Sequence, residues 1–247
     1  MNRATKTALS TLALLSLTAL TACGGGSGSN ADSAAKPSAS ASQEKQEAPE
    51  ERLKQLVITK ADLSGMEVSD ADVSNSEYSE YAFAKSQQEV AVEKPVCAPL
   101  AYAMNQLPLG EPQADLTRSV SKGLNDPFTY VLLAAYESGQ AKSTMTDLSN
   151  AVDACTGGFT AKANGNTSTY DSVAAEKPVA EAGDESLAFQ STLTFRGVAH
   201  TVHTQAVRSA DVLAVYFSVD GTAIANARPS DAKLSPTVVK AQNAKLA

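Results

Sequence analysis

The sequence predicts an α+β domain in which helices pack on one face of an antiparallel sheet. Two segments repeat apolar residues at helical spacing, and later segments are either apolar throughout or alternate apolar with polar residues, as strands do. The helical and extended segments do not follow the regular strand–helix–strand order of a parallel sheet, which favours the antiparallel arrangement.

The chain begins with a short basic and then apolar segment. Arg3 and Lys6 precede an uncharged run from Ala8 to Leu20 that is rich in Leu, Ala and Thr. A helix of this length reaches about 20 Å, which is shorter than the ~30 Å hydrocarbon core of a membrane. The segment therefore has the features of an export signal and not of a membrane-spanning helix.

A cysteine ends this apolar run, in the sequence Leu20-Thr21-Ala22-Cys23, and a glycine tract follows it. This resembles the lipobox of bacterial lipoproteins. The resemblance implies cleavage before Cys23 and attachment of a diacylglyceryl group to its sulfur, with palmitate-type acyl chains that anchor the chain in the membrane. The localisation expected from this is the outer face of the cytoplasmic membrane. The alternative is an ordinary secretory peptide with an incidental cysteine.

The chain then divides into three parts. Residues 1–22 are the signal peptide, and residues 23–51 are the lipidated Cys and a tether rich in Gly, Ser, Ala and Glu that lacks large apolar residues. Such a composition buries too little apolar surface to fold, so we expect disorder there. Residues 52–247 form the third part, and roughly 195 residues suit one domain with a good core.

The composition of the chain limits the classes of partner that we expect it to bind. The net charge is -7, which disfavours nucleic acid and anionic lipid surfaces. The chain has no Trp and 5% aromatic residues, which weighs against a sugar-stacking module. We expect no cofactor, and partners limited to the membrane through the lipid anchor and an unidentified small ligand or envelope protein.

Two cysteines other than Cys23 lie in the helical segments. Val96, Leu100, Met104 and Leu107 follow a helical period around Cys97, and Met145, Leu148 and Val152 do so before Cys155. Gly157-Gly158 ends the second helix. An exported chain with two remaining cysteines most simply pairs them, so we predict a Cys97–Cys155 disulfide between the helices. The alternative is two free buried thiols.

The extended segments follow. Pro127 to Glu137 is apolar at nearly every position, which predicts a strand buried on both faces. Apolar and polar residues alternate over 187–195 and 213–219, which predicts two more strands. Arg196-Gly197 predicts a tight turn, so that these strands and the segment after the turn form a meander. Ser235-Pro236 is a helix-start signal for a final helix.

These features together resemble a known family. A short opening helix, ADLSGMEV, a CAPL helix, a strand–helix pair ending in DAC, the AGDES turn and a closing meander are similar to the extracellular sensor domain of mycobacterial PknH-type Ser/Thr kinases and related actinobacterial lipoproteins. The resemblance implies one α+β domain with a cleft for an unidentified signal. This chain carries no kinase, and it has one possible disulfide where the kinase domains carry two.

Motifs for catalysis are weak. His200 and His203 are three residues apart in a strand, so they point to opposite sides and do not favour a metal site; we expect His200 to be a core residue. Ser119-Val-Ser-Lys122 matches the S-x-x-K pattern without its partner motifs. Asp184-Glu185 is an acidic pair in a predicted turn. We therefore expect no enzyme activity and no catalytic residue.

One polar face of the meander is the candidate binding site. With the predicted turn, His203 pairs with Gln190, and the face carries the candidate ligand-binding residues Gln190, Thr192, His203, Gln205 and Tyr216. The alternative is a solvated sheet face. The function expected is a non-catalytic ligand-binding or sensing module, and its alternative is an envelope structural or protein-interaction lipoprotein. A deep pocket would favour the first, and an exposed apolar patch without a pocket would favour the second.

Overall fold

The fold is known from a computed structural model that describes residues 47–71 and 84–247. These residues belong to one compact unit that spans residues 45–247. The expected signal peptide, Cys23 and the tether up to residue 46 lie outside the described residues. The α-helices are α1 Pro49–Leu56, α2 Ala98–Ala103, α3 Gln140–Ala154, α4 Gly221–Ala225 and α5 Pro236–Leu246, and the short 3₁₀ helices are η1 Lys60–Asp62, η3 Gln87–Glu89 and η4 Pro95–Cys97.

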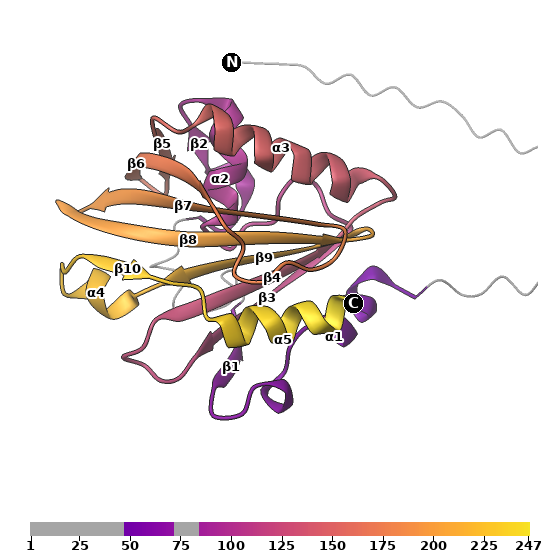
Figure 1. Ribbon diagram of the computed structural model, residues 1–247. Coiled ribbons are helices and arrows are strands. Elements are labelled where there is room, and N and C mark those ends of the chain that lie inside the picture. Colours follow the sequence, from indigo (N-terminus) through magenta and orange to yellow (C-terminus); the bar gives the residue numbers. More distant parts are fainter. Residues whose placement is uncertain (1–46, 72–83) are drawn as a thin grey trace, which may run out of the picture. The chain divides into compact units, whose positions relative to one another are not determined.

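One sheet organises these helices (Figure 1). Its strands are β1 Glu67–Asp70, β2 Ala91–Val92, β3 Ala114–Ser121, β4 Phe128–Ala135, β5 Phe159–Ala163, β6 Asn166–Glu176, β7 Glu185–Phe195, β8 Val198–Ser209, β9 Val212–Val219 and β10 Ser230–Ala232. They are ordered β1-β3-β4-β9-β8-β7-β6-β5-β2 with antiparallel pairings, and β10 pairs in parallel with β8. The α+β class and the single antiparallel sheet are confirmed.

The predicted meander is confirmed with its register. Arg196 and Gly197 both have positive φ, 51° and 79°, as a two-residue hairpin turn with the twist of the strands requires. Leu193 faces His200 across β7 and β8, and Gln190 faces His203. Strand β4 is buried on both faces, as its continuous apolar sequence predicts.

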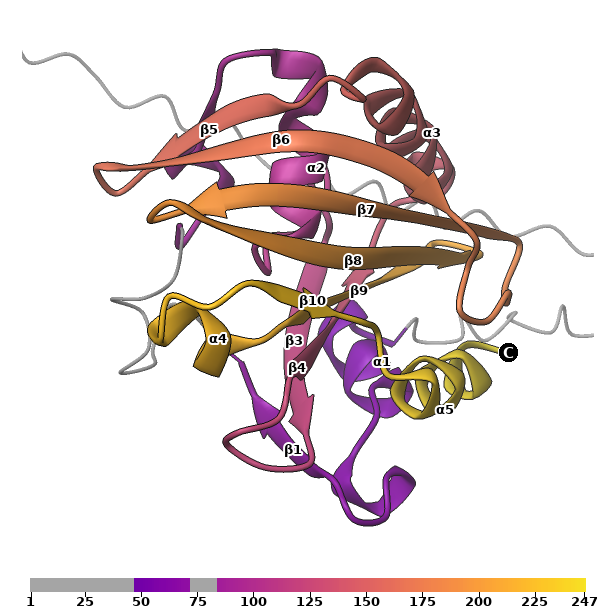
Figure 2. The same cartoon turned by 60° about the vertical axis from the view of Figure 1, so that its left-hand side comes forward.

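The helices cover both faces of the sheet, so the expectation of one covered face is wrong (Figure 2). Helices α2 and α3 pack on one face over Leu213, Val215 and Phe217 of β9. Helices α1 and α5 pack on the other face over Ala214 and Tyr216 of the same strand. The alternation in β9 conceals this second interface because β9 contributes the small Ala214 and the aromatic Tyr216 to it, between the large apolar residues of the first face.

The sequence signals at the helix ends are borne out in most places. The Ser235 side chain accepts a hydrogen bond from Val238 N at the start of α5, which has Pro236 in its first turn. Helix α3 ends at Ala154, and Gly158 has a φ of 81° in the turn after it. Helix α1 begins at Pro49, ahead of the domain boundary expected at Arg52.

The predicted disulfide is present. Cys97 and Cys155 are bonded, with their Cα atoms 6.0 Å apart, and both are fully buried between η4, α2 and α3. Within the described ranges, no helix combines the length and hydropathy needed to cross a membrane.

Candidate functional site

The five predicted ligand-binding residues lie on the same face of the sheet. Gln190 pairs with His203 between β7 and β8, and Gln205 pairs with Tyr216 between β8 and β9. Thr192 lies two residues beyond Gln190 on β7, half-buried, and its hydroxyl is 3.4 Å from that of Thr201. The structure therefore brings these residues onto one face.

Two of these residues are committed to internal contacts. Gln205 is fully buried; its Oε1 accepts from Val179 N at 2.8 Å and its Nε2 donates to Ala180 O at 2.7 Å. Tyr216 is also fully buried, and its hydroxyl donates to Asn243 Oδ1 of α5 at 2.7 Å. Burial raises the pKa of Tyr216. Gln205 thus holds the segment between β6 and β7, and Tyr216 holds α5.

His203 is the centre of a charged cluster on this face. Its Nδ1 lies 2.7 Å from Glu176 Oε2, and its Nε2 lies 2.6 Å from Asp231 Oδ1. Lys233 Nζ is 2.9 Å from the same Nε2. The hydrogen bond from His203, together with Lys233, holds the pKa of Asp231 below its ordinary value, against the opposing effect of burial. The cluster joins β6, β8 and β10, so its role in this structure is to hold these three strands together.

A small hollow adjoins His203. Its volume is about 370 Å³, and its lining includes His203, Lys233 and Val179. His203 itself is 4% exposed, so it offers little surface there. The ligand-binding role of the five residues stays a prediction; three of them are buried and already have partners within the protein.

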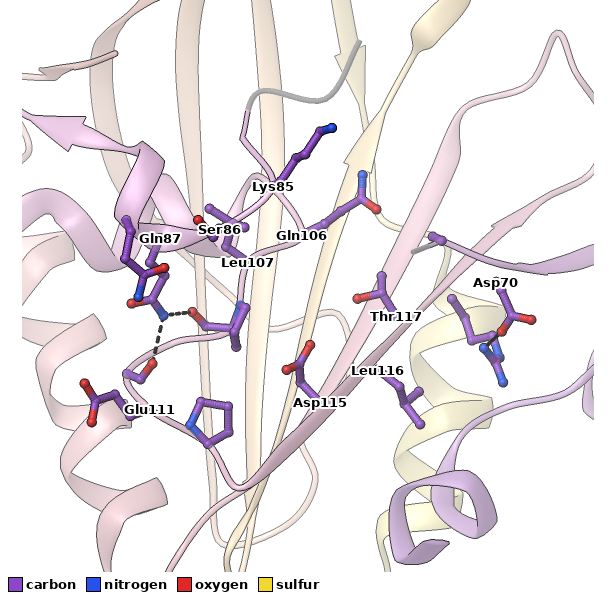
Figure 3. A pocket seen from close by; sticks show the side chains of 16 residues that line it. Asp70, Lys85, Ser86, Gln87, Gln106, Leu107, Glu111, Asp115, Leu116 and Thr117 are labelled. Carbon is purple, nitrogen blue, oxygen red and sulfur yellow. Dashed lines mark hydrogen bonds and ion pairs between the residues drawn. The ribbon is translucent and has the colours of Figure 1, made fainter. Parts of the chain in front are cut away.

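A larger hollow lies on the opposite face of the sheet, beside the first half of β3, where β1 does not pair with it (Figure 3). Its volume is about 770 Å³. Residues from four segments line it: 70–71 at the end of β1, 85–88 with the start of η3, 106–108 and 110–112 after α2, and 115–118 of β3. The sequence patterns pointed to none of these residues as a binding site, and they singled out Leu107 only as part of a helical period.

The loop that forms one wall is held in place from two sides. Gln87 Nε2 donates to the carbonyl oxygens of Pro108 at 2.6 Å and Gly110 at 2.8 Å. The buried Tyr136 hydroxyl donates to Leu109 O at 2.5 Å. Gly110 has a φ of 59°, a conformation that glycine adopts without strain. The wall is therefore fixed before any ligand binds.

Polar side chains point into this hollow. Asp115 and Thr117 alternate on β3, so they share one side of the strand, and the Gln106 side chain lies above Thr117 in the view of Figure 3. Gln106 has a φ of 58°, an uncommon conformation for a residue with a side chain. Its Oε1 is buried and, among the described residues, has no hydrogen-bond partner. At one end of the hollow, Arg118 forms an ion pair with Asp70.

The residues considered for catalysis lie at positions that a structural role explains. His200 is 2% exposed, and its Nδ1 lies 2.8 Å from Ser230 Oγ, as expected for a core histidine. Ser119 lies within β3, whereas the S-x-x-K motif requires a helix start. Within the ranges that the structure describes, no group of three or more His, Cys, Asp or Glu side chains is placed to hold a metal ion.

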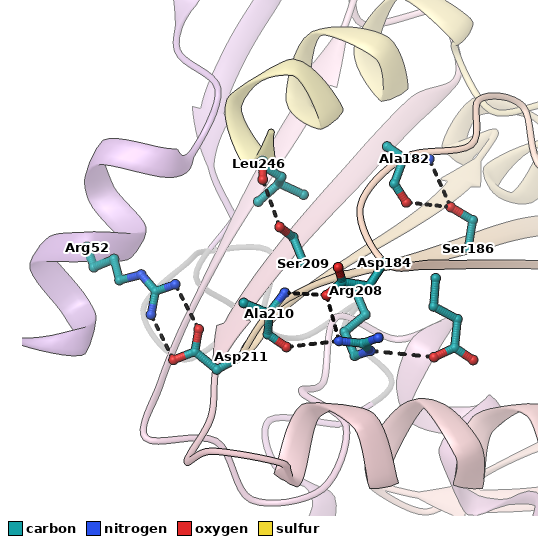
Figure 4. Close-up of polar contacts among 10 residues, drawn as sticks. Arg52, Ala182, Asp184, Ser186, Arg208, Ser209, Ala210, Asp211 and Leu246 are labelled. Carbon is teal, nitrogen blue, oxygen red and sulfur yellow. Dashed lines mark hydrogen bonds and ion pairs between the residues drawn. The ribbon is translucent and has the colours of Figure 1, made fainter.

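The AGDES turn is held by ion pairs (Figure 4). Asp184 Oδ2 accepts from Arg208 Nη1 and from Ala210 N, each at 2.8 Å, and Glu185 pairs with Arg208 Nε at 3.5 Å. In the same region Asp211 binds both Nη atoms of Arg52 at 2.8 Å, which holds α1 against the β8–β9 turn.

The sequence does contain a signal for the larger hollow. Pro108, Gly110 and Pro112 recur at every second position between the CAPL helix and the next strand. Such spacing favours a fixed irregular loop, and fixed loops often form binding sites. The strand edge that completes the hollow gives no comparable signal.

Comparisons with known proteins give likeness in structure alone. No protein-family model matches the sequence, and no curated protein does. Among solved structures, the fold is similar to the extracellular domain of PknH from Mycobacterium tuberculosis, with 13% identity and a TM-score of 0.49, over 80% of this chain and 93% of that one. Fold likeness at this level does not carry function.

Proposed function

We propose that the chain is a lipid-anchored extracytoplasmic module that binds a small ligand, without converting it, in the hollow beside β3. The observation that carries the proposal is the hollow itself. Its volume of about 770 Å³ lies within the range of about 300–1,000 Å³ that is usual for ligand sites. Its fixed wall favours binding because little ordering is needed when a ligand enters.

The anchor rests on the sequence around Cys23, where the apolar leader meets the lipobox-like Leu20-Thr21-Ala22-Cys23. Labelling of cells with radioactive palmitate tests it. The label is expected on the wild-type chain, and the Cys23→Ala variant is expected to carry none and to remain uncleaved or enter the medium. Equal labelling of both chains would contradict the anchor.

The alternative of a purely structural or interaction lipoprotein predicts an exposed apolar patch. Among the described residues, the exposed large apolar side chains are Val96, Leu124 and Val179, which lie on separate segments. Three such side chains on separate segments give no evidence of the contiguous patch that a docking surface requires. The structure therefore gives this alternative no specific support.

A comparison of two variants tests the site. Thr117→Tyr places a large side chain in the hollow, whereas Thr169→Tyr makes the same change at an exposed position of β6. In a thermal-shift screen of small metabolites, compounds that stabilise the wild type are expected to stabilise Thr169→Tyr and not Thr117→Tyr. Compounds that stabilise all three proteins equally would contradict binding in this hollow.

A further inference from the structure

The ring of His203 has a carboxylate at each of its nitrogens. Nδ1 lies 2.7 Å from Glu176 Oε2 of β6, and Nε2 lies 2.6 Å from Asp231 Oδ1 of β10. Strands β6 and β10 do not pair with each other, because β6 pairs with β5 and β7, and β10 pairs with β8. The buried ring is therefore a direct side-chain link between two strands that the sheet itself does not join.

The protonation of the ring decides whether this link can exist. A neutral imidazole has one N–H donor and one acceptor, whereas an imidazolium donates from both nitrogens. The two carboxylate contacts can be hydrogen bonds at the same time only when both nitrogens carry protons. In a neutral ring, one lone pair would face a carboxylate oxygen, and two acceptors at this distance repel each other.

A second partner competes for Nε2. Lys233 Nζ is 2.9 Å from this nitrogen and 3.0 Å from Asp231 Oδ1. Lysine only donates, so it can bond to Nε2 only when that nitrogen has lost its proton, and it can keep its ion pair with Asp231 meanwhile. The hydrogen bond from His203, and Lys233 as well, lower the pKa of Asp231, so this group stays a carboxylate while the ring titrates.

Other groups near the ring have no comparable contact with it. Lys177 lines the same small hollow as His203 and is exposed. On β7 the residue opposite His203 is the neutral Gln190. His200 points to the other face of the sheet, where its Nδ1 lies 2.8 Å from Ser230 Oγ of β10. His200 is thus a second histidine in contact with β10, and a test must separate the two.

We propose that His203 is a pH-dependent latch for β10. In the protonated form, Nε2 donates to Asp231, and the ring ties β10 to β6. In the neutral form, Nε2 accepts from Lys233, and the direct tie to Asp231 is lost. Histidine changes its charge between about pH 5 and 8, so the latch loosens as the pH rises through this range. The latch does not depend on a ligand in the hollow beside β3.

NMR of the purified chain with isotope-labelled histidine tests the latch. The chain has two histidines, so the His203→Gln variant assigns both rings. From about pH 5 to 8, His203 is expected to lose the proton of Nε2 and to keep that of Nδ1. A ring that loses the proton of Nδ1 instead, or that stays in one protonation state over this range, would overturn the inference.

Hydrogen exchange measures the hold on β10. The protection of its most protected amide, corrected for the intrinsic exchange rate, is expected to fall about tenfold from the acidic to the basic end of the range. His200→Gln is expected to keep this pH dependence, and His203→Gln to remove it. The reverse result would assign the effect to His200 and overturn the inference.

Two exposed positions give variants that are expected to fold. The side chains of Lys233 and Asp231 are 63% and 58% exposed. Lys233→Met removes the donor for the neutral ring, so the midpoint of the ring titration is expected to rise by about one pH unit. Lys240→Met, at an exposed position of α5, is expected to leave the midpoint unchanged. An equal midpoint in Lys233→Met and the wild type would overturn the inference.

Asp231→Asn supplies a further test. An amide can either donate to Nε2 or accept from it, so this contact then persists in both protonation states of the ring. The protection of β10 in Asp231→Asn is expected to stay constant over the same pH range. A tenfold fall in this variant, as in the wild type, would overturn the inference.

Discussion

Opening the Cys97–Cys155 bridge is expected to lower stability by a calculable amount. The bridge joins residues 58 apart in sequence, and both sulfurs are fully buried. In the chain-entropy model, a closed loop of this length stabilises the folded state by about 4 kcal/mol, because it restricts the unfolded chain. Reduction without mutation leaves the packing atoms in place, so this loop contribution dominates the difference.

The assay compares oxidised and reduced forms of the same chain. The reduced form is prepared by unfolding in reductant and refolding with reductant present. For a domain of this size each kcal/mol corresponds to about 2–4 °C, so Tm is expected to fall by roughly 8–16 °C. A lower urea midpoint for the reduced form is expected as well.

Two results would refute the reasoning. Equal Tm values for the oxidised and reduced forms would show that the bridge does not constrain the unfolded chain. Uptake of two alkylating labels by the unfolded but unreduced protein, measured by intact mass, would show that Cys97 and Cys155 are not bonded.

Three further predictions concern buried residues. Burial lowers the pKa of His200 below its ordinary value of 6.5, against the opposing effect of Asp220. As the pH falls, His200 therefore binds a proton in the unfolded chain before it does so in the folded protein. The free energy of unfolding then decreases as the pH falls below 6.5, by up to about 1.4 kcal/mol per pH unit, until the pH reaches the pKa of His200 in the folded protein. His200→Gln should reduce this slope in urea titrations at several pH values; an unchanged slope would contradict it. Gln205→Leu leaves Val179 N without its partner and removes the shorter of the two hydrogen bonds to Ala180 O, which keeps the one from Asn243. The variant should cost about 1–3 kcal/mol in urea unfolding, whereas wild-type stability would argue against the holding role of Gln205. Gly158→Ala should also destabilise by more than about 1 kcal/mol, because the new Cβ would meet backbone atoms of residues 170 and 171 at a positive φ; an unchanged Tm would contradict this.

Local sequence signals predicted much of the fold. The Arg196-Gly197 turn fixes the register of β7 and β8 because a two-residue hairpin allows one pairing, and that register is observed. Ser235-Pro236 marks the start of α5, and the two cysteines indicate the bridge. Each of these predictions depends on residues that are close in sequence or on covalent chemistry.

What could not be predicted depends on contacts between distant segments. The second covered face of the sheet needs α1 and α5, from opposite ends of the chain, to pack over Ala214 and Tyr216. For the same reason the polar face was predicted to be a cleft or a solvated surface, whereas Gln205 and Tyr216 are buried there. The hollow beside β3 combines four segments, and no periodicity connects them.

The measurement that tests the central claim most directly is an amide-resolved NMR titration of the purified chain with a compound that stabilises it in the thermal-shift screen. The account predicts shifts at Gln106, Asp115 and Thr117, around the hollow beside β3, and none at Gln190 or His203 on the other face. Shifts that cluster around His203, or no shifts near Asp115 at a saturating concentration of the compound, would contradict it.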